Sequence, residues 1–363
     1  MIHIAIGTKA QFIKMAPIIR LLQDKNIPFN LIDMGQHSLI TEGLRKEFGI
    51  REPDVYLSRG ENVSRLAQGL FWMAGILFKG LSSRWVRESI FRDKKGVCLI
   101  HGDTVSTLLA LYLARRGGVK VAHVEGGLRS NHLCEPFPEE MLRIWVMRLS
   151  DILFAPCEWA MGNLRKMRLD KKAVLISANT SLESTLYSLG KNIDTGLRVD
   201  KYCLITVHRM ENIFSRRRME NLLKLIENTA RKIPVVFVQH QPTLHQLRKF
   251  GLQKKLQALD NVIFLEILSH GHFISLLKGC EFVLTDGGSI QEESFYLDKP
   301  CLLLRRFSER PEGLGENVVI SELKREKIDH FLAGYAALKR KDPLAVTRPS
   351  QEILDSLSEY VTA

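Results

Sequence analysis

Short hydrophobic runs alternate with longer amphipathic segments along most of the chain. In the first half, five runs have the length of a buried strand, namely Ile2–Ile6, Phe29–Met34, Val97–Ile100, Val119–Val124 and Asp151–Ala155. Strands that are hydrophobic throughout and that alternate with helices are typical of a parallel sheet covered on both faces. The first half is therefore expected to form a doubly wound α/β domain.

The same rhythm restarts in the second half. The predicted strands are Tyr202–Val207, Pro234–Val238, Val262–Leu265, Phe282–Thr285 and Pro300–Leu304. The predicted helices are Arg216–Lys232, Pro242–Phe250, His272–Lys278 and Ser289–Tyr296, with a short terminal helix over Gln351–Val361. A polar stretch from Gly190 to Asp200 is expected to be a surface loop or a linker. The pattern predicts two Rossmann-like, doubly wound domains that face a cleft.

Length and composition agree with a two-domain soluble enzyme. The chain has 363 residues, 45% of them hydrophobic and 25% charged, which excludes a disordered protein. The formal charge of +12 is spread along the sequence without an RNP-like or zinc-finger pattern. An anionic substrate such as a diphosphate ester explains this charge, and no nucleic-acid partner is expected.

Neither a signal peptide nor a metal site is expected. The run from Ile2 to Ile6 lacks a basic lead and is broken by Gly7. The six cysteines are scattered without metal-ligand spacing, which favours the reducing cytoplasm.

The segment from Leu66 to Val86 is unusually hydrophobic. Lys79 interrupts it, and its uncharged part is far shorter than the roughly 20 residues that a spanning helix needs. We interpret it as a core helix or a subunit interface. Weak association with a membrane surface is the alternative, supported by the basic residues that follow, Arg84, Arg87, Arg92, Lys94 and Lys95.

Polar residues follow several predicted strands of the first half, where ligands bind in parallel sheets. Lys14 lies in the helix that opens after Gly7, Asp103 follows the strand ending at Ile100, and Glu125 follows Val124. Glu139 begins a further amphipathic helix. Each position has a structural explanation, since Asp103 suits a helix N-cap and Glu139 complements a helix dipole. Three carboxylates at such positions are nonetheless more than packing requires.

Two motifs in the second half have the same placement. His208 lies at the end of one predicted strand. Gly287 and Gly288 form a turn between another strand and a helix, where backbone N–H groups bind phosphate. Glu293, one turn into that helix, is placed to accept hydrogen bonds from a ribose diol, or it simply faces solvent.

Together, the motifs HGDT, HVEGGLRS, PFPEE, HRMEN, DGGSIQEE and SERPE resemble the non-hydrolysing UDP-N-acetylglucosamine 2-epimerase family. The resemblance runs from about Ile2 to Glu312. It implies a fold like that of GT-B glycosyltransferases, with the C-terminal helix returning to the first domain. The expected domains are residues 1–170 with 350–363, which carry the catalytic carboxylates, and residues 171–349, which bind UDP. The resemblance also implies a UDP-sugar substrate, a homodimer, and neither metal nor nicotinamide cofactor.

The reaction implied is inversion at C2 of a UDP-linked acetamido sugar for surface polysaccharide synthesis, by anti elimination of UDP and its re-addition. Inversion needs ionisable groups on both faces of the sugar. The resemblance assigns catalysis to Asp103, Glu125, Glu139 and His208, without deciding which carboxylate is acid or base. It assigns substrate binding to Lys9, Lys14, Arg143, Phe273, Gly287, Gly288, Ser289, Glu293 and Arg310.

Some members of the family bind a second UDP-sugar as an activator. The positions that fall near this site are Gln36, His37, Arg65, Arg209 and His240, whereas Leu39 replaces a residue that is polar in many members. The first loop reads Gly7-Thr8-Lys9-Ala10-Gln11, and a lysine lacks the two-pronged phosphate grip of the family's arginine. DGGS and HQPT likewise replace DSGG and HPRT, so a changed sugar or nucleotide is expected rather than lost catalysis. In its sequence Gln11-Phe12-Ile13-Lys14, the first loop resembles members acting on UDP-2,3-diacetamido-glucuronate more than those acting on UDP-N-acetylglucosamine.

Three alternatives remain. A hydrolysing epimerase would release UDP and free sugar. A glycosyltransferase would use the same fold but would leave the three carboxylates unexplained. A catalytically silent UDP-sugar-binding protein would account for the altered phosphate loops.

Overall fold

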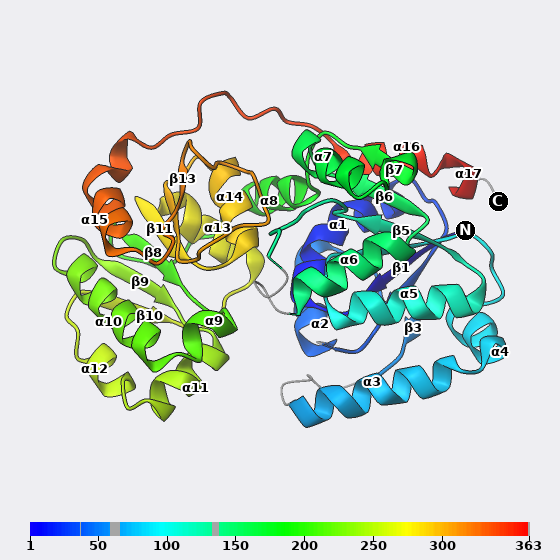
Figure 1. The fold of residues 1–363 in the computed structure, drawn as a ribbon, viewed down its shortest axis with the longest axis horizontal. Coiled ribbons are helices and arrows are strands. Elements are labelled where there is room, and N and C mark those ends of the chain that lie inside the picture. The colour runs from blue at the N-terminus through cyan, green and yellow to red at the C-terminus, as the bar shows by residue number, and fades with distance from the viewer. Residues whose placement is uncertain (37, 59–65, 133–137, 362–363) are drawn as a thin grey trace. The chain divides into compact units, whose positions relative to one another are not determined.

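The computed structural model describes residues 1–36, 38–58, 66–132 and 138–361. By its internal contacts the chain divides into unit 1, Met1–Ser184 with Val346–Ala363, and unit 2, Thr185–Ala345. Each unit is a parallel sheet with helices on both faces (Figure 1). The fold class is therefore confirmed, including the return of the C-terminal segment to the first unit. The Gly190–Asp200 stretch is irregular, but it lies within unit 2, and the division falls earlier, inside helix α8.

Unit 1 is built on a seven-stranded sheet in the order β3-β2-β1-β4-β5-β6-β7. Its strands are β1 Ile2–Ile6, β2 Phe29–Asp33, β3 Val55–Tyr56, β4 Val97–His101, β5 Lys120–Val124, β6 Ile152–Ala155 and β7 Ala173–Leu175. Its helices are α1 Lys9–Asp24, α2 Ser38–Phe48, α3 Leu66–Gly80, α4 Ser83–Trp85, α5 Val105–Gly117, α6 Glu139–Leu149, α7 Glu158–Lys166, α16 Pro349–Ser356 and α17 Ser358–Val361, with short π and 3-10 turns at Val86–Ile90 and Asp170–Lys172. Helix α8, Ser181–Leu189, runs from unit 1 into unit 2.

Unit 2 has a six-stranded sheet in the order β10-β9-β8-β11-β12-β13. The strands are β8 Cys203–Thr206, β9 Val235–Val238, β10 Val262–Leu265, β11 Phe282–Thr285, β12 Cys301–Leu303 and β13 Val318–Ile320. The helices are α9 Met210–Ile213, α10 Arg216–Ala230, α11 Gln241–Lys249, α12 Gln253–Gln257, α13 His270–Gly279, α14 Gly288–Tyr296 and α15 Arg325–Gly334, with a 3-10 turn at Tyr335–Ala337. The buried strands of both units form the cores, since most of their side chains are wholly inaccessible.

Two predictions of secondary structure differ from the structure. Three strands were not predicted, and the terminal helix predicted as one element is two helices. Strands β3, β7 and β13 have only two or three residues each and lie at sheet edges, so they lack the long hydrophobic run that marks a central strand. The predicted terminal helix is split into α16 and α17. Helix α16 is fastened to unit 1 because Ser350 donates to Glu183 through both its backbone N–H and its hydroxyl, at 2.8 and 2.7 Å.

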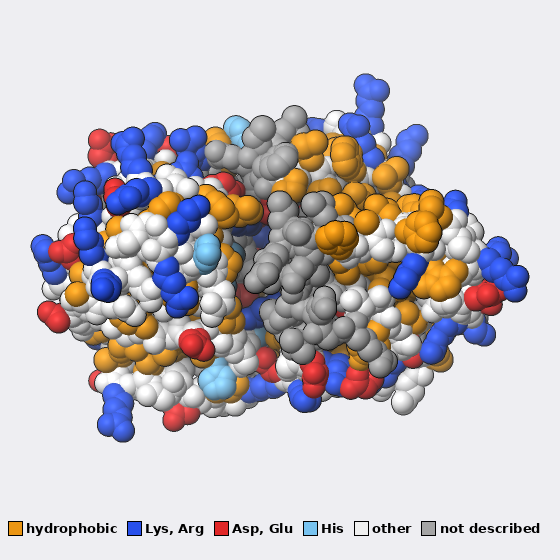
Figure 2. Space-filling model, turned by 90° about the horizontal axis from the view of Figure 1, so that it is seen from below, with side chains coloured by type: hydrophobic (Ala, Val, Ile, Leu, Met, Phe, Trp, Pro, Cys, Tyr) orange, Lys and Arg blue, Asp and Glu red, His pale blue; other side chains and the backbone are white. Residues whose placement is uncertain are grey.

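Helix α3 is a core helix on one side only. Ile76 is buried, and Trp72 and Met73 pack on the core beneath it. On the outer side, Phe71 and Phe78 are 80% and 77% exposed. Figure 2 shows hydrophobic side chains gathered on this face of unit 1. Within the described residues, no helix combines the length and hydrophobicity needed to cross a bilayer.

Two histidines lie inside the unit 1 sheet. His3 in β1 and His123 in β5 are fully buried, and each has its Nε2 within hydrogen-bond distance of a backbone carbonyl, Lys94 O at 3.0 Å and Gly102 O at 2.8 Å. Because a carbonyl only accepts, Nε2 carries the proton in both rings. Burial disfavours the charged ring and lowers the pKa of each histidine from 6.5 to about 4.

These two pKa values predict acid sensitivity of the fold. Between pH 6.5 and 4 the unfolded chain binds protons that the folded chain does not, so stability is lost as pH falls through this window. Each histidine should lower the free energy of unfolding by about 2 kcal/mol between pH 7 and pH 5. The variant His123→Gln keeps an N–H donor for Gly102 O but does not titrate. In urea unfolding at pH 7 and pH 5, the loss of unfolding free energy that comes from His3 and His123 should therefore be about half as large in the variant as in the wild-type protein. An unchanged loss would contradict the assignment.

Candidate functional site

In unit 1, the candidate residues lie at the carboxyl ends of the central strands. Strands β1, β4 and β5 are neighbours, with His101 of β4 paired with Val124 of β5. Asp103 lies two residues beyond the end of β4, and Glu125 directly follows β5. The sheet therefore brings together two of the three carboxylates that the sequence singled out.

Glu125 is buried among polar partners. It is 7% exposed and forms an ion pair with Lys14 from α1, itself 2% exposed. Asn179 Nδ2 donates to the same oxygen, Oε1, at 2.5 Å. The other oxygen, Oε2, lies 3.7 Å from His101 Nε2. These contacts fix both the position and the orientation of the carboxylate.

The backbone at Glu125 is strained. Its φ is +75°, a left-handed conformation that residues other than glycine rarely adopt. Conformations of this kind cost about 1 kcal/mol or more and cluster at functional sites. Together with the buried charge, the strained backbone indicates that Glu125 is retained for function rather than for stability.

Asp103 belongs to a second chain of ion pairs. It forms an ion pair with Arg143 of α6, and Arg143 Nη1 donates to Glu140 Oε2 at 2.8 Å. Glu140 also binds Arg129 and accepts the backbone N–H of Ser130. Glu140 is fully buried, and the two arginines balance its charge. Arg143 therefore reaches Asp103 from a rigid support.

Gln11 holds the loop that carries Asp103. Its amide nitrogen, which has two hydrogens to donate, lies within hydrogen-bond distance of His101 O, Thr104 Oγ1 and Thr107 Oγ1, at 2.7 to 3.0 Å. Its amide oxygen accepts the backbone N–H of Gly7 and completes a capping box with Thr8 at the start of α1. The loops after β1 and β4 are thereby joined through one buried side chain.

The remaining candidates of unit 1 occupy related positions. Glu139 is partly buried and is the first residue of α6, one turn before Arg143. Lys9 is the partly buried first residue of α1. Pro136 and Phe137, from the PFPEE motif that precedes α6, lie outside the described residues.

In unit 2, His208 is held by a buried aspartate. Asp286, which is 0% exposed and directly follows β11, accepts the backbone N–H groups of His208 and Arg209 at 2.9 to 3.2 Å and the side-chain amide of Asn212 at 2.9 Å. The His208 ring stacks on His240 with 4.6 Å between centroids. The ring keeps 35% of its side-chain surface exposed, but the surrounding protein displaces enough water to lower its pKa, against an opposing effect of Asp286. The neutral imidazole is therefore favoured.

The start of helix α14 is a glycine turn that lies beside Arg310. Gly287 is the N-cap and Gly288 the first helical residue, and Ser289 is partly buried beside them. A Cβ at Gly288 would lie 2.7 Å from Glu309 Oε1 and 3.0 Å from Arg310 Nε, so a larger residue would require these two side chains to shift. Arg310 forms an ion pair with Glu292 of α14.

Two further candidates lie on α14 and α13. Glu293 is 5% exposed and pairs with His270 at 3.1 Å. Phe273 is partly buried and packs on the core that includes Ile274 and Leu277. Both residues therefore belong to the same side of unit 2 as the start of α14.

The possible activator residues are distributed over both units. Gln36 lies after β2 in unit 1, whereas Arg209 is the N-cap of α9 and His240 the N-cap of α11 in unit 2. His37 and Arg65 lie outside the described residues. No group of histidine, cysteine and acidic side chains suited to a metal ion occurs in the described ranges.

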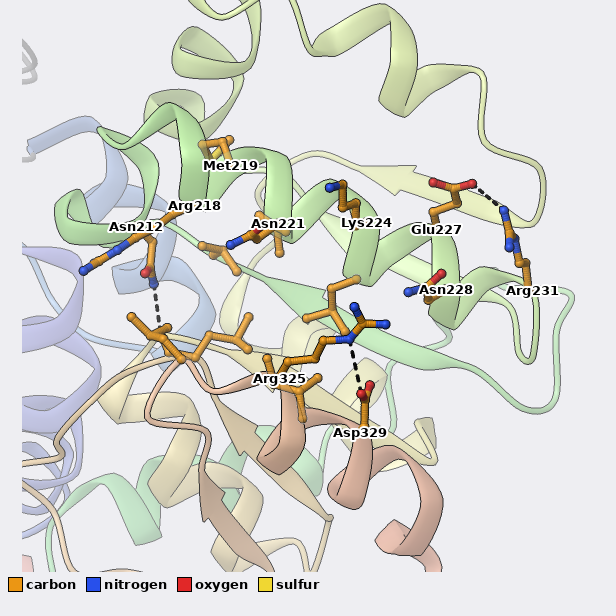
Figure 3. Close-up of a pocket in the computed structure, with 16 residues that line it drawn as sticks. Asn212, Arg218, Met219, Asn221, Lys224, Glu227, Asn228, Arg231, Arg325 and Asp329 are labelled. Atoms are coloured by element: carbon orange, nitrogen blue, oxygen red, sulfur yellow. Dashed lines mark hydrogen bonds and ion pairs between the residues drawn. The ribbon is translucent and has the colours of Figure 1, made fainter.

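A separate cavity of about 420 Å³ lies between α10 and α15 of unit 2 (Figure 3). Its floor is hydrophobic, and its rim carries two salt bridges, Glu227–Arg231 and Asp329–Arg325. Its lining reaches the His208 loop through Val207, which precedes His208, and through Asn212, whose amide is bonded to Asp286 and Leu304. None of the proposed catalytic or substrate-binding residues is among the residues that line it.

Sequence reasoning missed the residues that hold the candidates in place. Gln11 was named only as part of the first-loop sequence, with no role assigned to it. Asn179, Glu140 and Asp286 were not singled out. Asp286 and Glu140 had a local signal, because each adjoins a proposed residue in a quoted motif. Asn179 had none, because it reaches Glu125 across 54 positions of sequence.

Known proteins match the chain over most of its length. The sequence model of the UDP-N-acetylglucosamine 2-epimerase family matches residues 20–355. The UDP-N-acetylglucosamine 2-epimerase of Methanocaldococcus jannaschii is 30% identical over 346 residues, which cover 90% of each chain. The UDP-2,3-diacetamido-2,3-dideoxy-D-glucuronate 2-epimerase of Pseudomonas aeruginosa is 28% identical over 325 residues, covering 87% of this chain and 86% of that one.

A solved structure agrees along the whole length. The Methanocaldococcus jannaschii UDP-GlcNAc 2-epimerase, crystallised in complex with UDP-GlcNAc and UDP, superimposes with a TM-score of 0.86 at 28% identity and 99% coverage of both chains. The match of sequence family, fold and motif order leads to one conclusion. The chain belongs to the UDP-N-acetylglucosamine 2-epimerase family and is an isomerase.

Proposed function

We propose that the protein inverts C2 of UDP-N-acetylglucosamine or a derivative without net hydrolysis, by anti elimination of UDP and its re-addition. The observation that carries this proposal is Glu125, a buried and strained carboxylate at a strand end, with Asp103 at the end of the neighbouring strand. Removing a proton from one face of C2 and returning one to the other face requires two such groups.

The unit 1 residues would perform the proton transfers. Asp103, Glu125 and Glu139 are the candidate acids and bases, and the first two are held by Arg143 and Lys14. Because these carboxylates are already held in place, little free energy is spent on orienting them during the reaction. Lys14 and Arg143 would also attract the diphosphate, since arginine and lysine near a leaving group stabilise its growing charge.

The unit 2 residues would hold the nucleotide. The N–H groups at the start of α14 suit a diphosphate, and Arg310 of unit 2 and Lys9 of unit 1 would add positive charge. His208 would stabilise or protonate the departing phosphate oxygen. Glu293 would accept from the ribose hydroxyls, and Phe273 would lie beside uracil. That the two sets of residues converge on one UDP-sugar stays a prediction.

The sugar and the cellular role also belong to this proposal. UDP-N-acetylglucosamine is one candidate substrate, and UDP-2,3-diacetamido-2,3-dideoxy-glucuronate is the other, because a relative of each name matches over most of the chain. The product would supply surface polysaccharide synthesis from the cytoplasm. A homodimer and a second UDP-sugar acting as activator remain expectations from the family resemblance.

One prediction of the proposed function concerns isotope exchange. Incubating the protein with UDP-N-acetylglucosamine, or with the diacetamido-glucuronate derivative, in deuterated water should place deuterium at C2 of both epimers, because the proton returned comes from solvent through a side chain. Mass spectrometry and NMR measure the incorporation. Absence of exchange with either sugar would sink the proposal, whereas accumulation of free UDP with free sugar would replace it by the hydrolysing reaction.

The second prediction concerns Glu125. The variant Glu125→Gln keeps the shape but loses the proton-transfer group, so turnover should fall by about 10²- to 10⁴-fold. Glu158→Gln is the matched control, because Glu158 lies on α7 with 67% of its side chain exposed. Circular dichroism would verify that both variants fold. Wild-type turnover in a folded Glu125→Gln variant would remove Glu125 from the mechanism.

A further inference from the structure

A buried hydrogen-bond relay lies behind the proposed ribose-binding carboxylate. Ser188 Oγ lies 2.7 Å from His270 Nδ1, and His270 Nε2 lies 3.1 Å from Glu293 Oε1. The exposed fractions of Ser188, His270 and Glu293 are 0%, 3% and 5%. The three residues come from α8, α13 and α14, so the relay joins the part of α8 that lies in unit 2 to two further helices of that unit.

The partners fix the direction of each hydrogen bond. A carboxylate only accepts, so His270 Nε2 carries the proton and donates to Glu293. In the neutral ring Nδ1 is then the acceptor, and the Ser188 hydroxyl donates to it. The imidazole is thereby held at both nitrogens, and one oxygen of Glu293 is held in turn. Within the described residues, no hydrogen bond or ion pair to the second oxygen, Oε2, occurs.

Packing alone does not account for this arrangement. A buried histidine and a buried carboxylate both lose hydration, and hydrophobic residues of similar volume would stabilise the junction of three helices at least as well. The relay does provide a carboxylate with one oxygen fixed and one available. That is the arrangement needed to accept hydrogen bonds from a pair of neighbouring hydroxyls.

We propose that Ser188 and His270 are positioning residues that orient Glu293 toward the ribose diol of the bound nucleotide and so set its preference for ribose. This inference rests on the proposed function, because it takes UDP as the ligand of unit 2. Both residues belong to unit 2 and act on the ligand through Glu293. Loss of the relay therefore weakens ribose recognition while leaving the chemical step intact.

The test compares UDP with 2′,3′-dideoxy-UDP, which lacks both hydroxyls. Wild-type protein should bind UDP at least about tenfold more tightly in calorimetry, because one or two hydrogen bonds to a charged group are lost in the dideoxy compound. The variant His270→Leu should bind UDP about tenfold more weakly but the dideoxy compound within about twofold of wild type. The variant His270→Gln retains an N–H donor near the position of Nε2 and should recover most of the preference.

Two further measurements separate positioning from folding. In the epimerase assay, His270→Leu should raise KM with little change in kcat, because the ribose is bound equally well in the ground state and in the transition state. Ser188→Ala should show the same pattern to a smaller extent. His245→Leu, on the exposed surface of α11, is the control and should behave as wild type.

The outcomes distinguish the two proposals. If wild-type protein binds UDP but His270→Leu keeps the full ribose preference, the relay inference is wrong and the proposed function stands. Equal weakening of both ligands would also overturn it, because that result describes a structural role. If wild-type protein binds no UDP, both proposals fall.

Discussion

The buried ion pair between Lys14 and Glu125 is the interaction on which the unit 1 site depends. Glu125 leaves strand β5 in a left-handed conformation, and Lys14 with Asn179 holds its carboxylate there. Taking two charges out of water costs several kcal/mol per ion unless geometry and hydrogen bonds compensate. A pair that is both desolvated and strained is a poor means of stabilising a fold, so its presence calls for a chemical explanation.

The same logic extends through the site. Several proposed reactive or binding groups rest on a buried partner of opposite charge, as Asp103 does on Arg143 and Arg310 on Glu292. In unit 2, Asp286 supports the His208 loop, because its carboxylate accepts hydrogen bonds from the backbone N–H groups of His208 and Arg209. These arrangements place polar side chains at strand ends with little freedom to move, which is what proton transfer and leaving-group stabilisation require.

The sequence predicted the two sheets, their central strands and the places where polar residues follow them. Hydrophobic runs carry this information locally, and a parallel sheet collects its carboxyl ends at one edge. The short edge strands β3, β7 and β13 were missed because two or three residues make no pattern. The supporting partners were missed for another reason. Gln11 and Asn179 act across 90 and 54 positions of sequence, and such contacts exist only after folding. The altered HQPT segment proved compatible with the fold, because Pro242 lies in the first turn of α11, where proline is tolerated.

The central claim is that the Lys14–Glu125 pair serves chemistry at the expense of stability. The most direct test is the free energy of unfolding of the double variant Lys14→Met with Glu125→Gly, which removes both charges and relieves the positive φ. We expect a value within about 1 kcal/mol of wild type, since replacing a buried ion pair with uncharged residues is often neutral. A loss of more than about 3 kcal/mol, the cost typical of breaking a stabilising buried pair, would show that the pair holds the fold together and would contradict this account.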